Sequence, residues 1–507
     1  MAKICLCLTA KTLAENLEIL NQNRKYIDLV ELRADCLDPD ERLALRRFPE
    51  MAGIPVILAI RRSIDGGAYL AGEGSRVTLL AKGLAYADAD RRRNFAYVDL
   101  EEDLIVPSLE EVARAFGTRI IRSCYNIEGV IKNLPQKLTG LRRVGDELVK
   151  AVMMPHSLDD MLEVFQAARE AGNIEKVIAC TGEFGAAGGI LAEHLDSRVT
   201  YTYPEPAEGS QPAAPGQISP RELTEMYRFS EISAATKVFA VTGHSLESLP
   251  VSRFFNTIFA MEKTDAVHIP MPIASLPSLI RLSNGIGISA LSVTAPYKEE
   301  VLSYLSGKSA EVLGIGACNS LVAKSEGGET GVRWIGCNTD ALAFSDSLLT
   351  FLGRKDLRRR KVTIIGAGST ARVVAFEVHR LRGNALILNR TVGKARALAE
   401  PYRFAWGGLD SRGADLMERY SDIIIQASSL GASGNSGDPI EFYRFSGREI
   451  VMDIVFDPEK TFCLRRAEES GCRVLGGNDM LLRQLRYHYT HIMGKEFPPS
   501  LVSRVGV

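Results

Sequence analysis

The sequence predicts an α/β protein built from a (β/α)8 barrel and a two-domain half that follows it. Three observations support this prediction. The chain has 507 residues, which is too many for a single hydrophobic core and indicates two or three domains. Short runs rich in β-branched residues alternate with helix-like stretches through the first 235 residues. The alternation restarts at Lys237 and includes a glycine-rich turn between a strand and a helix.

The first part of the chain contains eight candidate strands, and a helical pattern lies between most of them. The candidate strands are 4–10, 26–35, 55–61, 95–102, 119–126, 148–154, 176–182 and 199–204. Eight βα units in about 230 residues fit a (β/α)8 barrel, with an open doubly wound sheet as the alternative. Residues 204–220 resemble a linker in composition, but the helix-like PRELTEMYRF follows at once and supplies the eighth helix. We therefore assign residues 1–233 to the barrel.

The second part begins with the strand-like runs VFAVTG, AVHIPM and ALSVTAP. After a helix-like segment at 340–352, the run KVTIIGAGSTARVVAFEVHRL reads as a strand, a glycine-rich turn and a helix. We expect an α/β substrate domain at 237–340, completed by 478–507, and a nucleotide-binding domain at 341–477.

Composition narrows the classes of function. Hydrophobic residues make up 46% of the chain and the net charge is −1, which favours neither nucleic acid nor an anionic membrane as partner. The nine cysteines form no CxxC pair, which fits a reducing cytosol and indicates no zinc or redox motif. No apolar run is long enough for a signal segment or a membrane helix. We expect a cytoplasmic enzyme that binds small molecules and no metal, and the sequence leaves the oligomeric state open.

The glycine-rich turn VTIIGAGSTA, at 362–371, has the spacing of a dinucleotide-binding motif. Gly366 permits the tight turn, Gly368 lets the backbone approach a pyrophosphate, and Ala371 allows close packing of helix on strand. The alternative is a purely structural turn. The position between an apolar strand and a long helix predicts a Rossmann domain, with cofactor contacts at Gly366, Ala367, Gly368, Ser369, Thr370 and Ala371.

The next strand ends at Asn389, Arg390 and Thr391. An NAD enzyme usually carries a carboxylate here, and that carboxylate would repel a 2′-phosphate. Arg390 can pair with such a phosphate, and Thr391 can donate to it. These residues therefore favour NADP as the cofactor, with an ordinary surface arginine as the alternative.

Several strings in the second half occur together in a fixed order: SVTAPYK (292–298), GACNS (316–320), GCNTD (336–340), GAGSTA, NRT and GGNDMLLRQ (476–484). With them, residues 237–507 resemble the shikimate dehydrogenase family. The resemblance implies NADPH-dependent reduction of 3-dehydroshikimate to shikimate, with Lys298 and Asp340 as the catalytic pair. The residue types suit that chemistry, because an ammonium can give a proton to the developing alkoxide while a carboxylate holds it in place.

The same resemblance assigns further contacts in this half. It implies substrate contacts from Thr294, Asn319 and Gln484, and cofactor contacts from Ile454 and Gly477. The family's serine string appears here as HSLESLPVSRFFN, in which Ser245 and Ser248 are our candidates for the substrate carboxylate. Phe456 stands where the family often has tyrosine. A dehydrogenase for quinate or another polyol acid is the alternative substrate assignment.

The barrel half carries the strings VELRAD (30–35), RRSIDGG (61–67), YVDLEE (97–102), ELVKAV (147–152) and APGQ (214–217). It resembles type I 3-dehydroquinate dehydratase, a family that forms 3-dehydroshikimate through a Schiff base. Lys150, on the sixth candidate strand, is then the Schiff-base lysine. We expect its apolar surroundings to lower its pKa and free the amine, with a lysine snorkelling at a strand end as the alternative.

Charged residues with a period of two on the second and fourth strands should point into the barrel, where charges are seldom structural filler. The resemblance implies substrate contacts from Glu31, Arg33, Arg61 and Gln217. Tyr125 stands where the family has its proton-shuttling histidine, Gly189 near the place of its loop arginine, and Ala213 in place of a serine. Loss of a general acid/base costs about 10²–10⁴-fold in rate. The alternative is therefore a dehydrogenase whose barrel is a structural or binding module.

Overall fold

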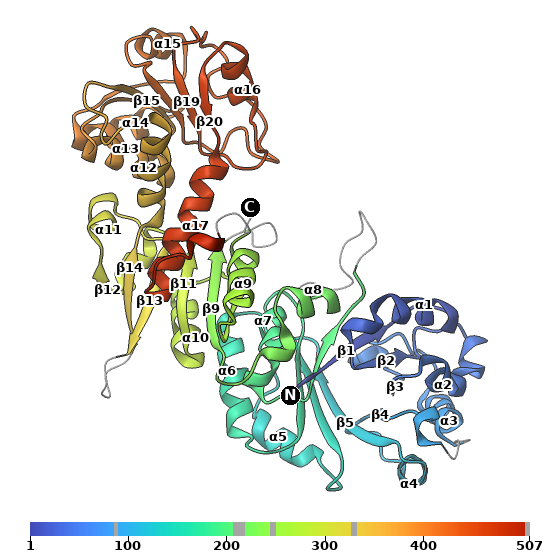
Figure 1. Ribbon diagram of the computed structural model, residues 1–507. Helices are drawn as coiled ribbons and strands as arrows, with labels where there is room; N and C mark the ends of the chain where they lie inside the picture. Colours follow the sequence, from blue (N-terminus) through green and yellow to red (C-terminus); the bar gives the residue numbers. More distant parts are fainter. Residues whose placement is uncertain (86–89, 206–217, 244–249, 326–331, 502–507) are drawn as a thin grey trace. The chain divides into compact units, whose positions relative to one another are not determined.

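The computed structural model describes residues 1–85, 90–205, 218–243, 250–325 and 332–501. The chain forms two compact units (Figure 1). The first comprises Met1–Phe239 and Phe259–Ile288, and the second comprises Ala240–Ile258 and Ser289–Val507. Within the described ranges, no helix combines the length and the apolar character that crossing a membrane requires.

The first unit contains a parallel eight-stranded sheet in the order β7-β6-β5-β4-β3-β2-β1-β8. Its strands are β1 (Lys3–Leu8), β2 (Leu29–Arg33), β3 (Val56–Ala59), β4 (Tyr97–Glu101), β5 (Arg119–Asn126), β6 (Leu148–Met153), β7 (Lys176–Cys180) and β8 (Val199–Thr202). The edge strands β7 and β8 meet through a bridge between Lys176 and Ser197, and the Ile178 N–H donates to Ser197 Oγ at 3.0 Å. The sheet is thereby nearly closed, which confirms the predicted barrel over the open sheet.

Helices surround this sheet and cover its outer face with aliphatic side chains. They are α1 (Leu13–Asn23), α2 (Phe48–Ala52), α3 (Glu73–Leu84), α4 (Pro107–Ala115), α5 (Leu134–Leu141), α6 (Leu158–Glu170), α7 (Gly185–Ile190) and α8 (Pro220–Glu225). Local sequence sets several of their first residues. Thr12 and Glu15 form a capping box at α1, and Ser157 accepts a hydrogen bond from Asp160 N at α6.

The interior of the barrel is layered. An apolar layer fills its lower part and consists of Cys5, Leu29, Ile57, Ile121, Leu148, Val177 and Val199. Side chains two residues further along a strand point to the same face, so the next layer also faces inward. That layer is polar and contains Glu31, Asp99, Ser123 and Lys150, all buried. The period-two pattern thus places buried charge directly above an apolar plug, toward the carboxyl ends of the strands.

A second, mixed sheet has six strands in the order β10-β9-β11-β13-β14-β12. They are β9 (Lys237–Gly243), β10 (Ala266–Pro272), β11 (Ile288–Val293), β12 (Leu305–Lys308), β13 (Ser320–Ser325) and β14 (Val332–Cys337), with helices α9 (Pro250–Glu262), α10 (Leu276–Ile286) and α11 (Ala310–Ile315). Strand β13 runs antiparallel to both β11 and β14. The turn after β11 and the helix after β14 therefore start at the same end of the sheet.

The third sheet is entirely parallel, in the order β17-β16-β15-β18-β19-β20. Its strands are β15 (Lys361–Ile365), β16 (Asn384–Leu388), β17 (Ala405–Gly407), β18 (Ile423–Gln426), β19 (Ile450–Asp453) and β20 (Arg473–Leu475). The helices are α12 (Thr339–Leu352), α13 (Ser369–Arg380), α14 (Val392–Ala399), α15 (Ser411–Met417), α16 (Phe462–Glu469) and α17 (Gly477–Met493). The strand order reverses between β15 and β18, which is where such sheets bind dinucleotides. The Rossmann prediction is confirmed.

Candidate active sites

Lys298 and Asp340 form a close ion pair in the second unit. Lys298 lies in the turn that follows β11, and Asp340 lies in the first turn of α12. Lys298 Nζ is 2.6 Å from Asp340 Oδ2, and Asp340 is 4% exposed as a whole residue. The N-terminal end of a helix favours a negative charge. The arrangement holds an ammonium in place while leaving it partly accessible, as a proton donor to a carbonyl oxygen requires.

Asn319 fixes the carboxylate of this pair. Its Nδ2 donates to Asp340 Oδ1 at 2.8 Å, and its Oδ1 accepts from Thr339 N at 2.8 Å. The amide therefore contacts the catalytic candidates directly, a positioning contact that the sequence motifs did not indicate. Thr294 Oγ1 donates to Thr242 O at 2.8 Å, and Gln484 lies partly buried on α17. Ser245 and Ser248 lie outside the described residues.

The glycine-rich turn joins β15 to α13 at the reversal of strand order. Gly366 has φ +116°, and a Cβ built there would lie 3.0 Å from Ala427 O. Gly368 is the N-cap of α13 and a Cβ there would meet nothing within 4 Å, while Ala371 is fully buried. Ala367, Ser369 and Thr370 are partly exposed. The turn therefore has open backbone at a helix N-terminus, which suits an anionic pyrophosphate.

Asn389, Arg390 and Thr391 follow β16 at the same edge of the sheet. Arg390 and Thr391 are exposed, and Asn389 Nδ2 donates to Thr391 O at 3.0 Å. Gly477, the first residue of α17, packs against backbone, because a Cβ there would lie 2.5 Å from the carbonyl oxygens of Ile454 and Val455.

Asp453 is a buried residue at the carboxyl end of the parallel sheet, at the same edge as the glycine-rich turn, and the sequence motifs did not include it. It ends β19, accepts from Val455 N at 3.0 Å and from Thr461 Oγ1 at 2.7 Å, and is fully buried. Burial raises its pKa to about 6. Its two acceptor contacts fix the turn that contains Ile454 and Phe456. A carboxylate at the end of an apolar strand was the available sequence signal.

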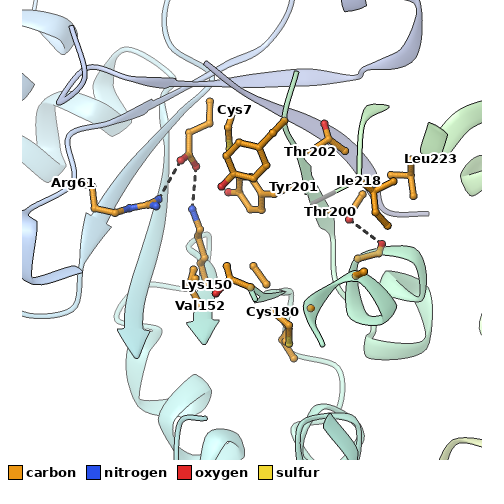
Figure 2. Close-up of a pocket in the computed structure, with 18 residues that line it drawn as sticks. Cys7, Arg61, Lys150, Val152, Cys180, Thr200, Tyr201, Thr202, Ile218 and Leu223 are labelled. Atoms are coloured by element: carbon orange, nitrogen blue, oxygen red, sulfur yellow. Dashed lines mark hydrogen bonds and ion pairs between the residues drawn. The ribbon is translucent and has the colours of Figure 1, made fainter. Parts of the chain in front are cut away.

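Lys150 occupies the polar layer of the barrel between the carboxylates of Glu31 and Asp99. Figure 2 shows the Lys150 and Arg61 side chains directed toward each other in the pocket. Lys150 Nζ is 2.8 Å from Asp99 Oδ2 and 3.0 Å from Glu31 Oε2, and Lys150 is 1% exposed. We call Glu31, Asp99 and Lys150 the Lys150 cluster. Lys150 and Glu31 line a pocket together with Cys7, Arg61, Val152, Ile178, Ala179, Cys180, Thr181, Gly185, Ala186, Gly189, Thr200, Tyr201, Thr202, Tyr203, Ile218 and Leu223.

The expected lowering of the Lys150 pKa is wrong. Burial alone would lower it, but the charges of Asp99 and Glu31 outweigh burial and hold the pKa of Lys150 well above its usual value. Burial would likewise raise the pKa of Glu31, yet Lys150 and Arg61 lower it to about 2. The apolar run around Lys150 indicated burial correctly, but the two carboxylates come from β2 and β4 and are not local in sequence.

The two arginines predicted to contact substrate already have carboxylate partners. Arg33 binds Asp35 through two hydrogen bonds of 2.9 and 2.7 Å, and Arg61 Nη2 is 3.1 Å from Glu31 Oε1. The Arg61 guanidinium also lies 4.6 Å from the centre of the Tyr125 ring. Gln217 and Ala213 lie outside the described residues. Gly189, in α7, lines the pocket.

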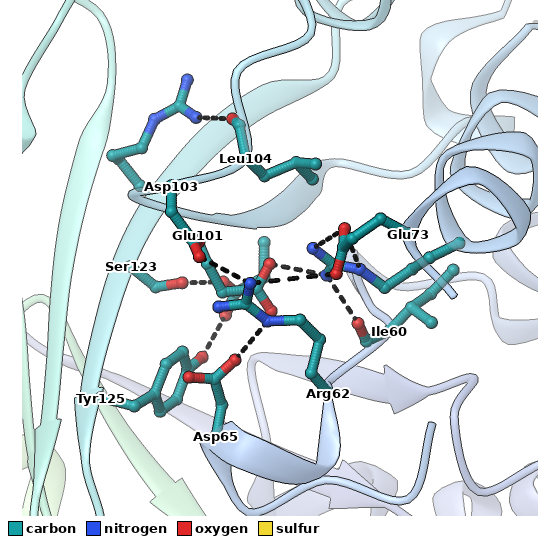
Figure 3. Close-up of polar contacts among 12 residues, drawn as sticks. Ile60, Arg62, Asp65, Glu73, Glu101, Asp103, Leu104, Ser123 and Tyr125 are labelled. Carbon is teal, nitrogen blue, oxygen red and sulfur yellow. Dashed lines mark hydrogen bonds and ion pairs between the residues drawn. The ribbon is translucent and has the colours of Figure 1, made fainter. Parts of the chain in front are cut away.

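A polar network fixes the loops that follow β3 and β4 (Figure 3). Arg62 contacts Asp65 and Asp103, each at 2.7 Å. Arg76 Nη1 is 2.6 Å from Glu101 Oε2. On the inner side of this network, Asp99 accepts hydrogen bonds from Ser123 and Tyr125. Figure 3 shows Tyr125 and Ser123 on the same side of this network, both from β5.

Comparisons with known proteins find relatives of both halves of the chain. Residues 4–234 match the family model of type I 3-dehydroquinase. The chain is 24% identical over 494 residues to the bifunctional 3-dehydroquinate dehydratase/shikimate dehydrogenase of Arabidopsis thaliana, named as chloroplastic, with 94% of this chain and 79% of that protein covered. It is 25% identical over 393 residues to the shikimate biosynthesis protein AroDE of Chlamydia muridarum, with 76% of each covered.

The second half has more similar relatives. It is 33% identical over 249 residues to the shikimate dehydrogenase (NADP(+)) of Pyrococcus abyssi. The aligned residues cover 49% of this chain and 89% of that protein. Among the described residues, no group of three His, Cys, Asp or Glu side chains is placed to hold a metal ion. The chain belongs to the shikimate dehydrogenase family and carries a type I 3-dehydroquinase region before the dehydrogenase.

Proposed function

We propose that the chain catalyses two successive steps of the shikimate pathway, which supplies aromatic amino acid biosynthesis. The barrel dehydrates 3-dehydroquinate to 3-dehydroshikimate, and the second half reduces 3-dehydroshikimate to shikimate with NADPH. The 2.6 Å pair of Lys298 and Asp340 is the observation that supports the reductase most directly. The bifunctional relative from Arabidopsis thaliana, which matches 94% of this chain, favours this assignment over a dehydrogenase with a degenerate barrel.

The described residues fit NADP. Gly366 permits the turn, the open Gly368 backbone at the α13 N-terminus suits the pyrophosphate, and exposed Arg390 suits the 2′-phosphate. Bound NADPH supplies the hydride for the carbonyl carbon. Lys298 gives its proton to the carbonyl oxygen, and Asp340 holds the ammonium and stabilises its charge before transfer. Asn319 holds Asp340, while Thr294 and Gln484 are our proposed contacts to the substrate hydroxyls.

Replacement of Lys298 tests the reductase assignment. We expect Lys298→Met to lower kcat for shikimate oxidation with NADP by about 10²–10⁴-fold, because the group that takes the hydroxyl proton in this direction, and returns it in the reduction, is lost. NADPH binding, measured by fluorescence titration, should be unchanged. The exposed Lys308 provides the control variant Lys308→Met, for which kcat should equal that of the unmodified chain. Full turnover in Lys298→Met would refute the assignment.

In the barrel we propose that Lys150 attacks the ketone of 3-dehydroquinate and forms a Schiff base. The nucleophile must be the neutral amine, and Asp99 and Glu31 lie close enough to accept its proton. Borohydride added with 3-dehydroquinate should reduce the imine and leave a stable adduct on Lys150. Lys176 is the matched control, because it is another fully buried lysine of a barrel strand and should stay unlabelled in peptide mapping. No adduct on Lys150 would leave the barrel as a structural or binding module.

We also propose the division into residues 1–233, 237–340 with 478–507, and 341–477, which is supported by one separate sheet in each part. A reducing compartment such as the cytoplasm is our proposed location. Its support is that all nine cysteines are free and that six of them are buried (Cys5, Cys7, Cys124, Cys318, Cys463 and Cys472).

A further inference from the structure

Asp99 connects Lys150 to a tyrosine. Asp99 Oδ2 accepts from Lys150 Nζ at 2.8 Å and from Tyr125 Oη at 3.0 Å. Its Oδ1 accepts from Ser123, and Asp99 is 4% exposed. Tyr125 is only partly buried and belongs to the upper layer of the barrel, two residues beyond Ser123 on β5. The carboxylate is therefore held at the base of the site, with the phenol nearer the mouth.

Among the residues that the structure describes, no histidine lines the pocket at the Lys150 cluster. Residues 1–233 contain two histidines, His156 and His194. His156 Nε2 is hydrogen-bonded to Glu128 O at 3.0 Å, and His194 lies in the short 3-10 helix Ala192–Leu195. Neither lines the pocket among the residues that the structure describes. Removal and return of protons next to Lys150 must therefore use other groups.

We propose that Asp99 and Tyr125 form the proton relay of the dehydration in the barrel, with Asp99 as the base and Tyr125 as the acid. The proposal rests on the proposed Schiff-base function of Lys150. After the imine has formed, the proton transfers of the dehydration are carried out by Asp99 and Tyr125, which share a hydrogen bond.

With the substrate held as an iminium on Lys150, Asp99 takes a proton from the carbon next to the iminium carbon, and the C–H electron pair forms an enamine. The enamine electrons then break the C–O bond of the β-hydroxyl, and Tyr125 gives its proton to that oxygen, which leaves as water. The Asp99 proton passes to the phenolate across the 3.0 Å hydrogen bond, and both groups return to their starting states. Water then hydrolyses the conjugated iminium to the enone and the Lys150 ammonium.

The surroundings of the two side chains favour Asp99 as the base and Tyr125 as the acid. Burial raises the pKa of Tyr125 above its usual value, so the phenol begins protonated and cannot be the initial base. Pairing with Lys150 and Arg61 lowers the pKa of Glu31 to about 2 against the effect of burial, so Glu31 is a weak base, and it has no hydrogen bond to Tyr125 among the contacts of the described residues. The Arg61 guanidinium, 4.6 Å from the Tyr125 ring centre, stabilises a transient phenolate.

The substitution Tyr125→Phe removes the acid and retains the ring. We expect kcat for dehydration to fall at least about 100-fold. Borohydride should still label Lys150, but the trapped adduct should carry the undehydrated substrate, one water heavier in mass than the product adduct. The matched control is Tyr26→Phe, because Tyr26 Oη donates to the Glu225 carboxylate at 2.7 Å on the barrel surface. That variant should dehydrate at the rate of the unmodified chain.

The outcomes separate the two proposals. No adduct in the unmodified chain refutes the Schiff-base function itself. An adduct in the unmodified chain together with a Tyr125→Phe rate within a few-fold of normal refutes the relay alone. Loss of the adduct in Tyr125→Phe also refutes the relay, because the phenol would then be needed before elimination.

The substitution Tyr125→His provides a readout that a packing role would not change. An imidazole titrates near pH ~6.5, so the kcat profile of this variant should gain an inflection there that the unmodified chain lacks. A profile with the same shape in both proteins would contradict proton transfer by residue 125.

Discussion

Glu31 carries a buried negative charge between two cations, with Lys150 at 3.0 Å and Arg61 at 3.1 Å. These charges lower the pKa of Glu31 from 4.5 to about 2, although burial acts in the opposite direction. A carboxyl whose pKa is lower in the folded chain stabilises the fold at pH values above its unfolded pKa. That contribution is lost as the pH falls through the folded pKa. The relevant window is therefore from about pH 4.5 down to about pH 2.

We expect the free energy of unfolding of the barrel to fall on the order of 3 kcal/mol across this window because of Glu31. Glu31→Gln should remove most of that pH dependence. Hydrogen exchange of β2 amides is the suitable measurement, since both tryptophans, Trp334 and Trp406, lie in the second unit. Glu102→Gln serves as the control, because Glu102 pairs with Lys137 at the surface, where an ion pair contributes little. An unchanged slope in Glu31→Gln would contradict the assigned charge.

At the scale of elements, the start of α17 depends on a glycine that touches backbone. A Cβ at Gly477 would lie 2.5 Å from the carbonyl oxygens of Ile454 and Val455. Neither oxygen can move without the β19 end of the sheet moving as well. The helix can therefore begin this close to the sheet only with glycine at its first position.

Gly477→Ala should lower the stability of the second unit by about 1–3 kcal/mol and weaken NADPH binding, because the helix start must shift away from the carbonyls. Gly393→Ala is the matched control in α14, where a Cβ would meet nothing within 4 Å. That change should be neutral or stabilise by about 0.4–1 kcal/mol. The midpoints of thermal unfolding of the two variants can be compared by monitoring the fluorescence of Trp334 and Trp406. Equal midpoints for the two variants would show that the close approach is unimportant.

Elements differ in how far the sequence predicts them. The barrel strands follow from β-branched runs bounded by helical patterns, and each lies within or beside its predicted range. The packing of α10 against α6 does not follow from either helix alone. There Arg281 contacts Asp159 at 2.6 Å, and Gly285 leaves space for the Leu162 side chain. These residue types are common on protein surfaces, so the sequence does not indicate that they meet. Periodicity predicts a helix and its apolar face but not a polar contact more than a hundred residues away.

At the scale of the whole molecule, each candidate site is built within one unit. The Lys150 cluster belongs to the first unit, and the Lys298–Asp340 pair belongs to the second. Ordered motif strings predicted Lys298, Asp340 and the glycine-rich turn, because these residues lie in short continuous segments. The Asn319 contact to Asp340 and the role of Asp99 could not be predicted in this way, since each joins segments that meet only in the fold.

Placement in separate units predicts that the two reactions can be removed independently. Lys150→Arg keeps a cation between the carboxylates but cannot form an imine, and Lys298→Met removes the reductase donor. Each variant should lose NADPH consumption from 3-dehydroquinate and keep the other partial reaction. An equimolar mixture should regain it, because the intermediate is a small molecule that can diffuse between chains. A mixture that stays inactive although both partial reactions persist would show that the intermediate is not released.

The two carboxylates around Lys150 have a consequence for the energetics of the whole catalytic cycle. A protonated amine and an iminium both carry one positive charge at the same nitrogen, so Asp99 and Glu31 meet an unchanged electric field at the start and after imine formation. The attacking amine, the carbinolamine and the enamine are neutral at this nitrogen, so only these intervening states lack the positive charge that Asp99 and Glu31 face in the ammonium and in the iminium. The fixed carboxylates of Asp99 and Glu31 can therefore stabilise both the ammonium and the iminium without moving. Hydrogen exchange in β2 and β4 should accordingly be the same in the resting chain and in the borohydride-reduced adduct, whose secondary amine is again protonated.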